Sequence, residues 1–352
     1  GSRRGPVGHV WMSQFAANGW LLATAGRDGM VRLWDSTADL ECRYLPINDP
    51  IYEYCFSPDG KMMAIVNTGG TVNVVLVATG EVLAAFETGS IGPVTNVAFS
   101  PDGNYLAMIK NNERILIGNV LTGEMATTFQ GGEMSLSALA YSADGRQIAC
   151  GGKEGRLIIL STTGKRQITH LEKLNKSILN LIYSPDGRQL AVAAGTSVVL
   201  MDVNGWNRVA KLSHSRLVRC IQYSPDGQTL FAAGDDKKAT LWDLSTQQPS
   251  MTYIGHQDRI VSISLSPELK TLATIAGDRT LRLWDVHTGQ ELIMFPIMQS
   301  NRPVIAFSPR ERILATNSWY SADRHGIILL EATSIPFNEL AENKDGIAPA
   351  YD

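Results

Sequence analysis

The tetrapeptide Ser57-Pro58-Asp59-Gly60 recurs along this chain and decides its fold. Identical copies begin at residues 100, 184 and 224, and altered copies begin at residues 16, 142, 266 and 308, so successive copies start 40 to 43 residues apart. Proline presets φ for a tight turn, aspartate accepts local backbone hydrogen bonds, and glycine supplies a positive φ. The repeat therefore predicts a tight turn in each of eight units of similar length.

Strand patterns lie on both sides of each turn. Alternating apolar residues precede it, as in residues 94–99, and an apolar run follows it, as in residues 189–193. A third strand pattern such as residues 280–285 comes next, and a fourth, more polar one ends the unit. Because a small four-stranded sheet cannot bury both faces alone, we expect the units to pack radially. The sequence thus predicts an all-β fold, a single closed β-propeller with eight four-stranded blades or, as the alternative, seven.

The repeat also sets the expected boundaries and the way the ring closes. We expect three segments: residues 1–6 as a linker headed by the cloning remnant Gly1-Ser2, residues 7–340 as the propeller, and residues 341–352 as an acidic tail. The last unit needs an outer strand beside residues 326–331. We expect residues 335–340 to supply it, although Pro336 weakens a strand.

Three units carry a second motif that ends in Trp-Asp, at residues 28–35, 238–243 and 280–285. With these motifs, and with the Gly255-His256 pair, the chain resembles the Trp-Asp-repeat (WD-repeat) propeller family. The resemblance implies buried tetrads of His, Ser or Thr, Asp and Trp. The matching positions are His256, Thr274, Asp278 and Trp284; His214, Asp236 and Trp242, with Ala232 where the hydroxyl should be; and Thr24, Asp28 and Trp34, with Pro6 at the histidine position. The other units have Val75, Gly118, Leu160, Met201 and Leu330 at the Trp position, so we expect apolar packing there.

Composition and motifs argue against several function classes. The net charge of −3 gives no general attraction to nucleic acid or to an anionic membrane, although residues 153–216 hold ten Lys or Arg against four Asp or Glu. Nucleic-acid binding through that basic sector is the third hypothesis, and we regard it as the weakest. No signal peptide, long apolar run or Cys-x-x-Cys pair is present, which predicts a cytoplasmic protein and no membrane contact. The sequence contains no metal-ligand spacing and no catalytic motif, so we expect no cofactor, no metal and no enzyme activity.

The resemblance implies a binding face where the inner strands begin. The candidate residues are Arg27, Asn111, Lys153 and Asp235 before the tetrad aspartates, Arg216 and Arg259 at the starts of inner strands, and Trp319 and Tyr320 in a long turn of the last unit. We expect a monomeric, non-catalytic protein-interaction scaffold or sensor domain, part of a longer signalling protein, whose partner is a protein of unknown identity. The alternative is a propeller enzyme or small-ligand-binding protein with a site on the central axis.

Overall fold

The computed structural model shows β-strands joined by short turns. None of the described residues forms a helix, so that part of the chain contains no helix able to cross a membrane. The described residues are 10–15, 21–26, 31–35, 41–47, 51–89, 93–130, 135–162, 167–174, 176–297, 303–309, 313–317 and 325–331.

Six sheets each consist of four consecutive antiparallel strands. The first two are β5 (Ile51–Phe56), β6 (Met62–Asn67), β7 (Thr71–Leu76) and β8 (Val82–Glu87), then β9 (Val94–Phe99), β10 (Tyr105–Lys110), β11 (Arg114–Asn119) and β12 (Met125–Gln130). The next two are β13 (Leu136–Tyr141), β14 (Gln147–Gly152), β15 (Arg156–Ser161) and β16 (Gln167–Lys173), then β17 (Ile178–Tyr183), β18 (Gln189–Ala194), β19 (Ser197–Asp202) and β20 (Arg208–Ser213). The last two are β21 (Val218–Tyr223), β22 (Thr229–Gly234), β23 (Lys238–Asp243) and β24 (Gln248–Ile254), then β25 (Ile260–Leu265), β26 (Thr271–Ala276), β27 (Thr280–Asp285) and β28 (Glu291–Pro296).

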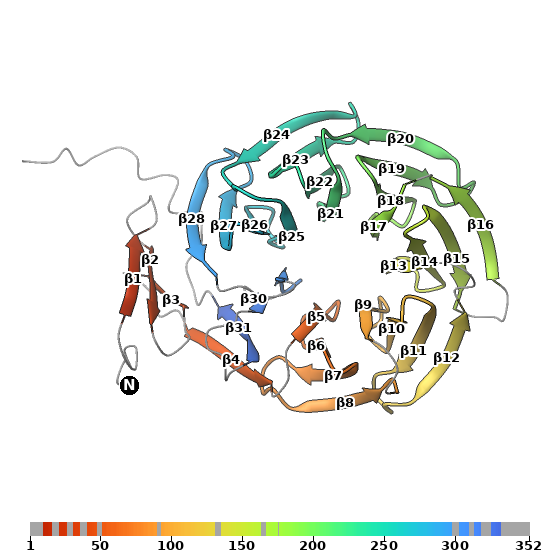
Figure 1. Cartoon of the computed structure of the whole chain (residues 1–352), viewed down its shortest axis with the longest axis horizontal. Helices are drawn as coiled ribbons and strands as arrows, with labels where there is room; N and C mark the ends of the chain where they lie inside the picture. The colour runs from red at the N-terminus through yellow and green to blue at the C-terminus, as the bar shows by residue number, and fades with distance from the viewer. Residues whose placement is uncertain are drawn as a thin grey trace, which may run out of the picture.

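One further four-stranded sheet draws its strands from distant parts of the chain. It contains β29 (Ile305–Phe307), β30 (Ile313–Asn317), β31 (His325–Glu331) and β4 (Glu41–Ile47). The four-stranded sheets stand around a common axis with the first strand of each sheet innermost (Figure 1). We expected residues 335–340 to supply the outer strand of this last sheet. That expectation is wrong, because β4 pairs with β31 along its whole length and so occupies the edge; residues 335–340 themselves lie outside the described residues.

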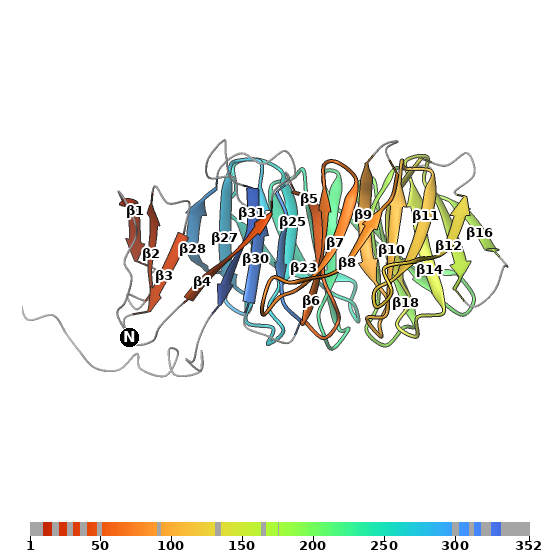
Figure 2. The same cartoon turned by 90° about the horizontal axis from the view of Figure 1, so that it is seen from below.

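The strands of the first unit lie outside the ring. β1 (Val10–Phe15), β2 (Leu21–Gly26) and β3 (Val31–Asp35) form a three-stranded sheet, which stands beside the ring next to β4 and β28 (Figure 1, Figure 2). An all-β propeller is therefore confirmed, but neither predicted blade count is supported. Eight is wrong because this sheet does not join the ring. Seven regular blades are not supported either, because only six sheets are built from four consecutive strands, and the further four-stranded sheet takes β4 from a distant part of the chain.

The repeated turns have the geometry that their residues predict. In the first regular copy, Gly60 has φ 74° and its N–H donates to the Ser57 carbonyl over 2.9 Å. The Ser57 hydroxyl donates to Asp59 Oδ1 over 2.6 Å and accepts the Met62 N–H over 2.9 Å. Since this hydroxyl donates to the carboxylate, it lowers the pKa of Asp59 below its ordinary value. Each turn thus fixes the path from an inner strand to the second strand of its sheet.

The apolar core lies between neighbouring sheets. Ala64, Val66 and Phe86 of one sheet pack with Val97 and Met108 of the next. Gly118 stands at the Trp position of the second of these sheets, where a Cβ atom would lie only 2.3 Å from the ring of Phe86. A large residue at this position would therefore displace Phe86 from the core, which explains why this unit lacks the Trp.

Side chains on the inner strands tie one sheet to the next. Gln222 Oε1 accepts the Leu265 N–H over 2.9 Å, and Ser264 Oγ accepts the Phe307 N–H over 2.8 Å. Where the first and last parts of the ring meet, the Tyr54 hydroxyl lies 3.0 Å from the Val304 carbonyl oxygen and 2.7 Å from that of Ala315. These contacts link β5 to the sheet of β29–β31 at the seam of the ring.

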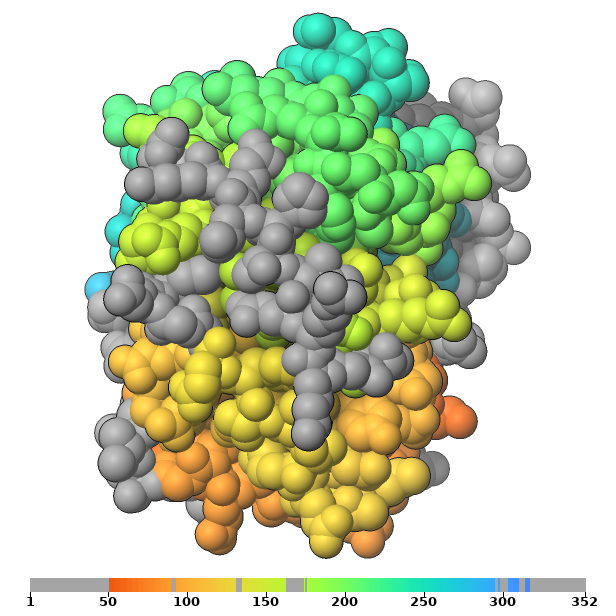
Figure 3. All heavy atoms as spheres, turned by 90° about the vertical axis from the view of Figure 1, so that its right-hand side faces the viewer, coloured from red at the N-terminus to blue at the C-terminus, as the bar shows by residue number. Residues whose placement is uncertain are grey.

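The outer strands form the rim of the ring. Figure 3 shows this rim from the side of β12 and β20, with residues of these strands in yellow and green. Nearly all of β12 is exposed, and four of the six residues of β20 are exposed. The outer strands thus expose most of their residues, but they also add buried side chains to the core, such as Phe86 of β8 and Leu212 of β20.

Candidate functional site

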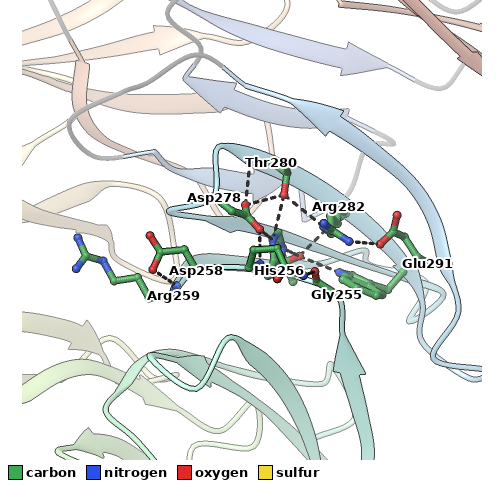
Figure 4. A network of polar contacts seen from close by, with 11 residues as sticks. Gly255, His256, Asp258, Arg259, Asp278, Thr280, Arg282 and Glu291 are labelled. Atoms are coloured by element: carbon green, nitrogen blue, oxygen red, sulfur yellow. Dashed lines mark hydrogen bonds and ion pairs between the residues drawn. The ribbon is translucent and has the colours of Figure 1, made fainter.

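A chain of hydrogen bonds joins four polar side chains of the β25–β28 sheet. The Trp284 indole N–H donates to Thr274 Oγ1 over 2.8 Å, and this oxygen lies 2.7 Å from His256 Nε2. His256 Nδ1 lies 2.9 Å from Asp278 Oδ2 (Figure 4). The structure thus brings together the four residues that the family resemblance implied for this unit.

The order of donors favours one tautomer of His256 in this network. Since Thr274 accepts from the indole, its hydroxyl proton is available for His256 Nε2, and the proton on Nδ1 then donates to Asp278. Burial lowers the pKa of His256, and the neighbouring carboxylate offsets this only in part. Burial alone would raise the pKa of Asp278, but hydrogen bonds from the Gln257 N–H, Thr280 and His256 hold it below its ordinary value. At neutral pH the imidazole is neutral and the carboxylate is ionised.

The β21–β24 sheet has a shortened version of this network. Ala232 replaces the hydroxyl, and the Trp242 indole N–H donates directly to His214 Nε2 over 3.1 Å. His214 Nδ1 then lies 3.8 Å from Asp236 Oδ2. Losing one hydroxyl therefore shortens the chain of donors but keeps the histidine between the indole and the carboxylate.

A buried lysine makes a tie that the sequence analysis missed. Lys110, at the end of β10, is only 4% exposed, and its Nζ donates to Thr88 Oγ1 and to the Gly89 carbonyl, each over 2.9 Å. Burial lowers the pKa of Lys110. This contact fastens the segment after β8 to the next sheet, in a unit that has no tetrad. The apolar pattern of residues 105–109 gave no signal for it.

A cavity of about 810 Å³ lies on the axis where the inner strands begin. Its wall includes residues near the starts of several inner strands, among them Glu53, Asn96, Asn180 and Arg219. Turns between second and third strands complete it, with Asn112, Lys153 and Arg279. Because residues from every four-stranded sheet around the axis contribute, the complete ring is needed to form this cavity.

Positive charge prevails on the cavity wall. The cationic lining residues are Lys153, Arg219, Arg259 and Arg279, and the acidic ones are Glu53 and Asp258. Arg219 forms a two-point ion pair with Asp235, which does not itself line the cavity. The Asp258 carboxylate accepts the Arg259 backbone N–H over 2.7 Å, and the Arg259 guanidinium extends away from the His256 network (Figure 4). The cavity can therefore attract anionic groups.

The structure places two of the predicted binding residues, Lys153 and Arg259, in the cavity wall. Asp235 takes part through Arg219. Arg216 and Asn111 are not among the lining residues; Asn111 occupies a turn with φ 57°, and its neighbour Asn112 lines the cavity instead. The sequence analysis missed Arg219 and Arg279, although the strand pattern could have placed Arg219 at the start of an inner strand.

The remaining predicted residues belong to parts of the chain where side chains are not described. Arg27, Asp28, Trp319 and Tyr320 lie outside the described residues. Thr24 lies in β2 and Trp34 lies in β3 of the outer sheet. Among the described residues, no group of three His, Cys, Asp or Glu side chains could hold a metal ion.

Comparison with known proteins adds partial matches. The family described as WD domain, G-beta repeat matches residues 5–35, 206–243 and 247–285. Nuclear distribution protein nudF 2 of Penicillium rubens is 39% identical over 61 residues, which is 17% of this chain and 13% of that protein. Apoptotic protease-activating factor 1 of Homo sapiens is 34% identical over 94 residues, 24% of this chain and 7% of that protein.

A third relative, nuclear distribution protein PAC1 of Arthroderma otae, is 41% identical over 63 residues, 17% of this chain and 14% of its own length. Each match thus spans only a small part of the relative. The three family matches cover the three units in which we found Trp-Asp motifs. The resemblance to the Trp-Asp-repeat family is therefore confirmed, and this chain carries WD repeats on an all-β propeller.

Proposed function

We propose that this chain is a non-catalytic protein-interaction scaffold that binds an acidic segment of a partner protein at the mouth of the axial cavity. The observation that carries the proposal is the lining of this cavity, which has four cationic side chains against two acidic ones; one of the four, Arg219, forms an ion pair with Asp235 outside the lining. Guanidinium groups bind carboxylates through directed, charge-assisted hydrogen bonds. Arg259 and Lys153 come from different sheets, so an extended segment crossing the mouth would reach both.

Neutral polar groups in the wall support recognition of a peptide. Asn96, Asn112 and Asn180 line the same cavity as the cations and offer amide donors and acceptors. A backbone crossing the cavity needs such partners, because it would otherwise lose its hydrogen bonds to water. Two of the three family repeats lie in sheets of the ring whose residues line this cavity.

Charge reversal tests this proposal. We expect the double variant Lys153→Glu, Arg259→Glu to lose most of its affinity for a fluorescein-labelled Glu- and Asp-rich peptide, measured by fluorescence anisotropy at low salt. Arg188→Glu is the matched control, because Arg188 is exposed in a repeated turn at the opposite end of an inner strand. Equal affinity of the wild type and the double variant would contradict the proposal.

A small-ligand site on the axis is the second candidate, and the volume of the cavity favours it. Sites for small molecules usually measure about 300–1,000 Å³, and this cavity lies in that range. Citrate, a compact tricarboxylate, separates the two functions. If citrate displaces the peptide at a concentration near its own dissociation constant and binds more tightly than the peptide, the small-ligand function is favoured.

We also propose that the propeller acts as a monomeric recognition or sensor domain within a longer, cytoplasmic signalling protein. The small share of each relative that the matches cover supports a longer parent chain. Free thiols support a reducing compartment: Cys55, Cys150 and Cys220 are unpaired, and burial raises the pKa of Cys55 to about 12. Light scattering after size exclusion should give the mass of one chain.

A further inference from the structure

The connection between β3 and β4 has the length of a hairpin connection. β3 ends at Asp35 and β4 begins at Glu41, so residues 36–40 separate them. In the β25–β28 sheet, residues 286–290 separate β27 from β28, which is also five residues. There the two strands pair with each other, whereas β4 pairs with β31.

The sequences of the two strand pairs also correspond. Val31-Arg32-Leu33-Trp34-Asp35 of β3 matches Leu281-Arg282-Leu283-Trp284-Asp285 of β27. β4 begins with Glu41 and has Pro46 as its sixth residue, just as β28 begins with Glu291 and ends with Pro296 as its sixth. Thus β4 has the spacing and the residue types of an outer strand for β3.

The register of the β25–β28 sheet predicts how β3 and β4 would pair. In that sheet Leu281 lies opposite Phe295, Arg282 opposite Met294, and Leu283 opposite Ile293. A shift of 250 residues places Val31 opposite Leu45, Arg32 opposite Tyr44, and Leu33 opposite Arg43. In the observed ring, the same three residues of β4 lie opposite β31: Leu45 opposite Ile327, Tyr44 opposite Ile328, and Arg43 opposite Leu329.

Both β3 and β31 therefore have an edge that fits β4. In the described part of the chain β3 pairs only with β2, and its sheet is the one sheet with three strands. Figure 1 shows β4 starting close to the end of β3 before it runs along β31. An open strand edge has backbone N–H and C=O groups that favour pairing with another strand.

We propose that β4 exchanges between these two edges. In the closed arrangement β4 completes the sheet of β29–β31, and β1–β3 remains three-stranded. In the exchanged arrangement β4 folds back on β3, so that the outer sheet gains its fourth strand and β31 becomes the open edge at the seam. Closing the five-residue connection costs less chain entropy than joining strands from opposite ends of the chain, whereas the pairing with β31 forms a longer ladder. These opposing terms make two arrangements of similar free energy possible.

The exchange would act on the axial site through the seam. Removing β4 leaves the β29–β31 sheet with three strands next to the Tyr54 contacts, and Val304 at the start of this sheet lines the cavity. A partner bound in the cavity would favour the closed arrangement, whereas a strand that pairs with β31 would favour the exchanged one.

Disulfide trapping of the full chain tests the exchange. In a Cys42→Ser background, Tyr44→Cys is combined with Ile328→Cys to trap the closed arrangement, or with Arg32→Cys to trap the exchanged one. The matched control combines Tyr44→Cys with Leu33→Cys, which is one residue out of the predicted register. After mild oxidation, mass spectrometry of non-reduced peptides measures each crosslink, and circular dichroism checks that every variant keeps its β-sheet content.

We expect intramolecular crosslinks in both trapping variants, with the 32–44 bond forming several-fold faster than the 33–44 bond. Complete 44–328 crosslinking with no 32–44 bond above the control would overturn the proposal. A 32–44 bond found only in covalent dimers would also overturn it, since β4 would then pass between two copies. Both trapping variants carry the Tyr44→Cys substitution, so a folding defect at this position would reduce both crosslinks and would show in the circular dichroism.

Discussion

At the scale of single residues, Asp278 is the position on which the polar network of the β25–β28 sheet depends. Its carboxylate accepts bonds from His256, Thr280 and the Gln257 N–H. We predict that Asp278→Ala lowers the free energy of unfolding by about 1–3 kcal/mol, because a buried donor is left without its acceptor. Urea denaturation measures this loss. Asp258→Ala, which removes an exposed carboxylate from the connection between β24 and β25, is the control, and equal midpoints for Asp278→Ala and wild type would contradict the role of the network.

His256 gives the stability of the chain a pH dependence. Burial lowers the pKa of His256 in the folded state, so the unfolded chain binds a proton more readily. This contribution is complete above the ordinary histidine pKa of about 6.5 and is lost as the pH falls through the lower folded value. We predict that the unfolding free energy falls between pH 7 and pH 5, and falls less in His256→Gln. Parallel pH profiles of the two proteins would contradict this assignment.

At the scale of elements, two buried tyrosines on inner strands make a matched pair. The Tyr54 hydroxyl contacts two backbone carbonyls across the seam, whereas the buried Tyr183 hydroxyl has no hydrogen-bond partner among the described residues. We predict that Tyr54→Phe costs about 1–3 kcal/mol of unfolding free energy, because it removes the only hydroxyl proton that Tyr54 shares between these two buried carbonyls. Tyr183→Phe should change stability little or increase it. If Tyr54→Phe and Tyr183→Phe lower the unfolding free energy equally in urea denaturation, the hydrogen bonding of Tyr54 across the seam does not stabilise the fold.

The elements themselves could be predicted from local residues. Ser-Pro-Asp-Gly specifies its turn because each of its residues meets a local requirement, and Gly60 has the positive φ that the turn needs. The tetrad around His256 could be predicted because its spacing follows one repeat. The strand pattern could place Arg219, but it could not predict the ion pair of Arg219 or the hydrogen bonds of Lys110, because each contact reaches a neighbouring strand or turn whose distance the pattern does not give.

At the scale of the whole molecule, ring closure was the part that the sequence did not predict. β3 fits β4 by spacing, whereas β31 lies at the other end of the chain and pairs with β4 along its whole length, which the local sequence pattern does not give. We predict that deletion of residues 1–35 leaves the urea midpoint nearly unchanged, because β4 and the ring remain. Deletion of residues 1–47 also removes β4. Each cross-strand pair contributes roughly 0.2–1 kcal/mol, so losing the pairing with β31 should cost a few kcal/mol. Equal midpoints for the two truncations would show that β4 does not hold the ring.

The hydrogen bonds between neighbouring inner strands divide the backbone amides of this ring into two classes of hydrogen exchange. Most strand amides bond within their own sheet, and they exchange with solvent when that sheet melts. The N–H groups of Leu265, Ile305 and Phe307 bond instead to side chains of the preceding sheet. Their deuterium uptake therefore reports the separation of two neighbouring sheets. If the sheets separate while each one stays folded, these three amides exchange first.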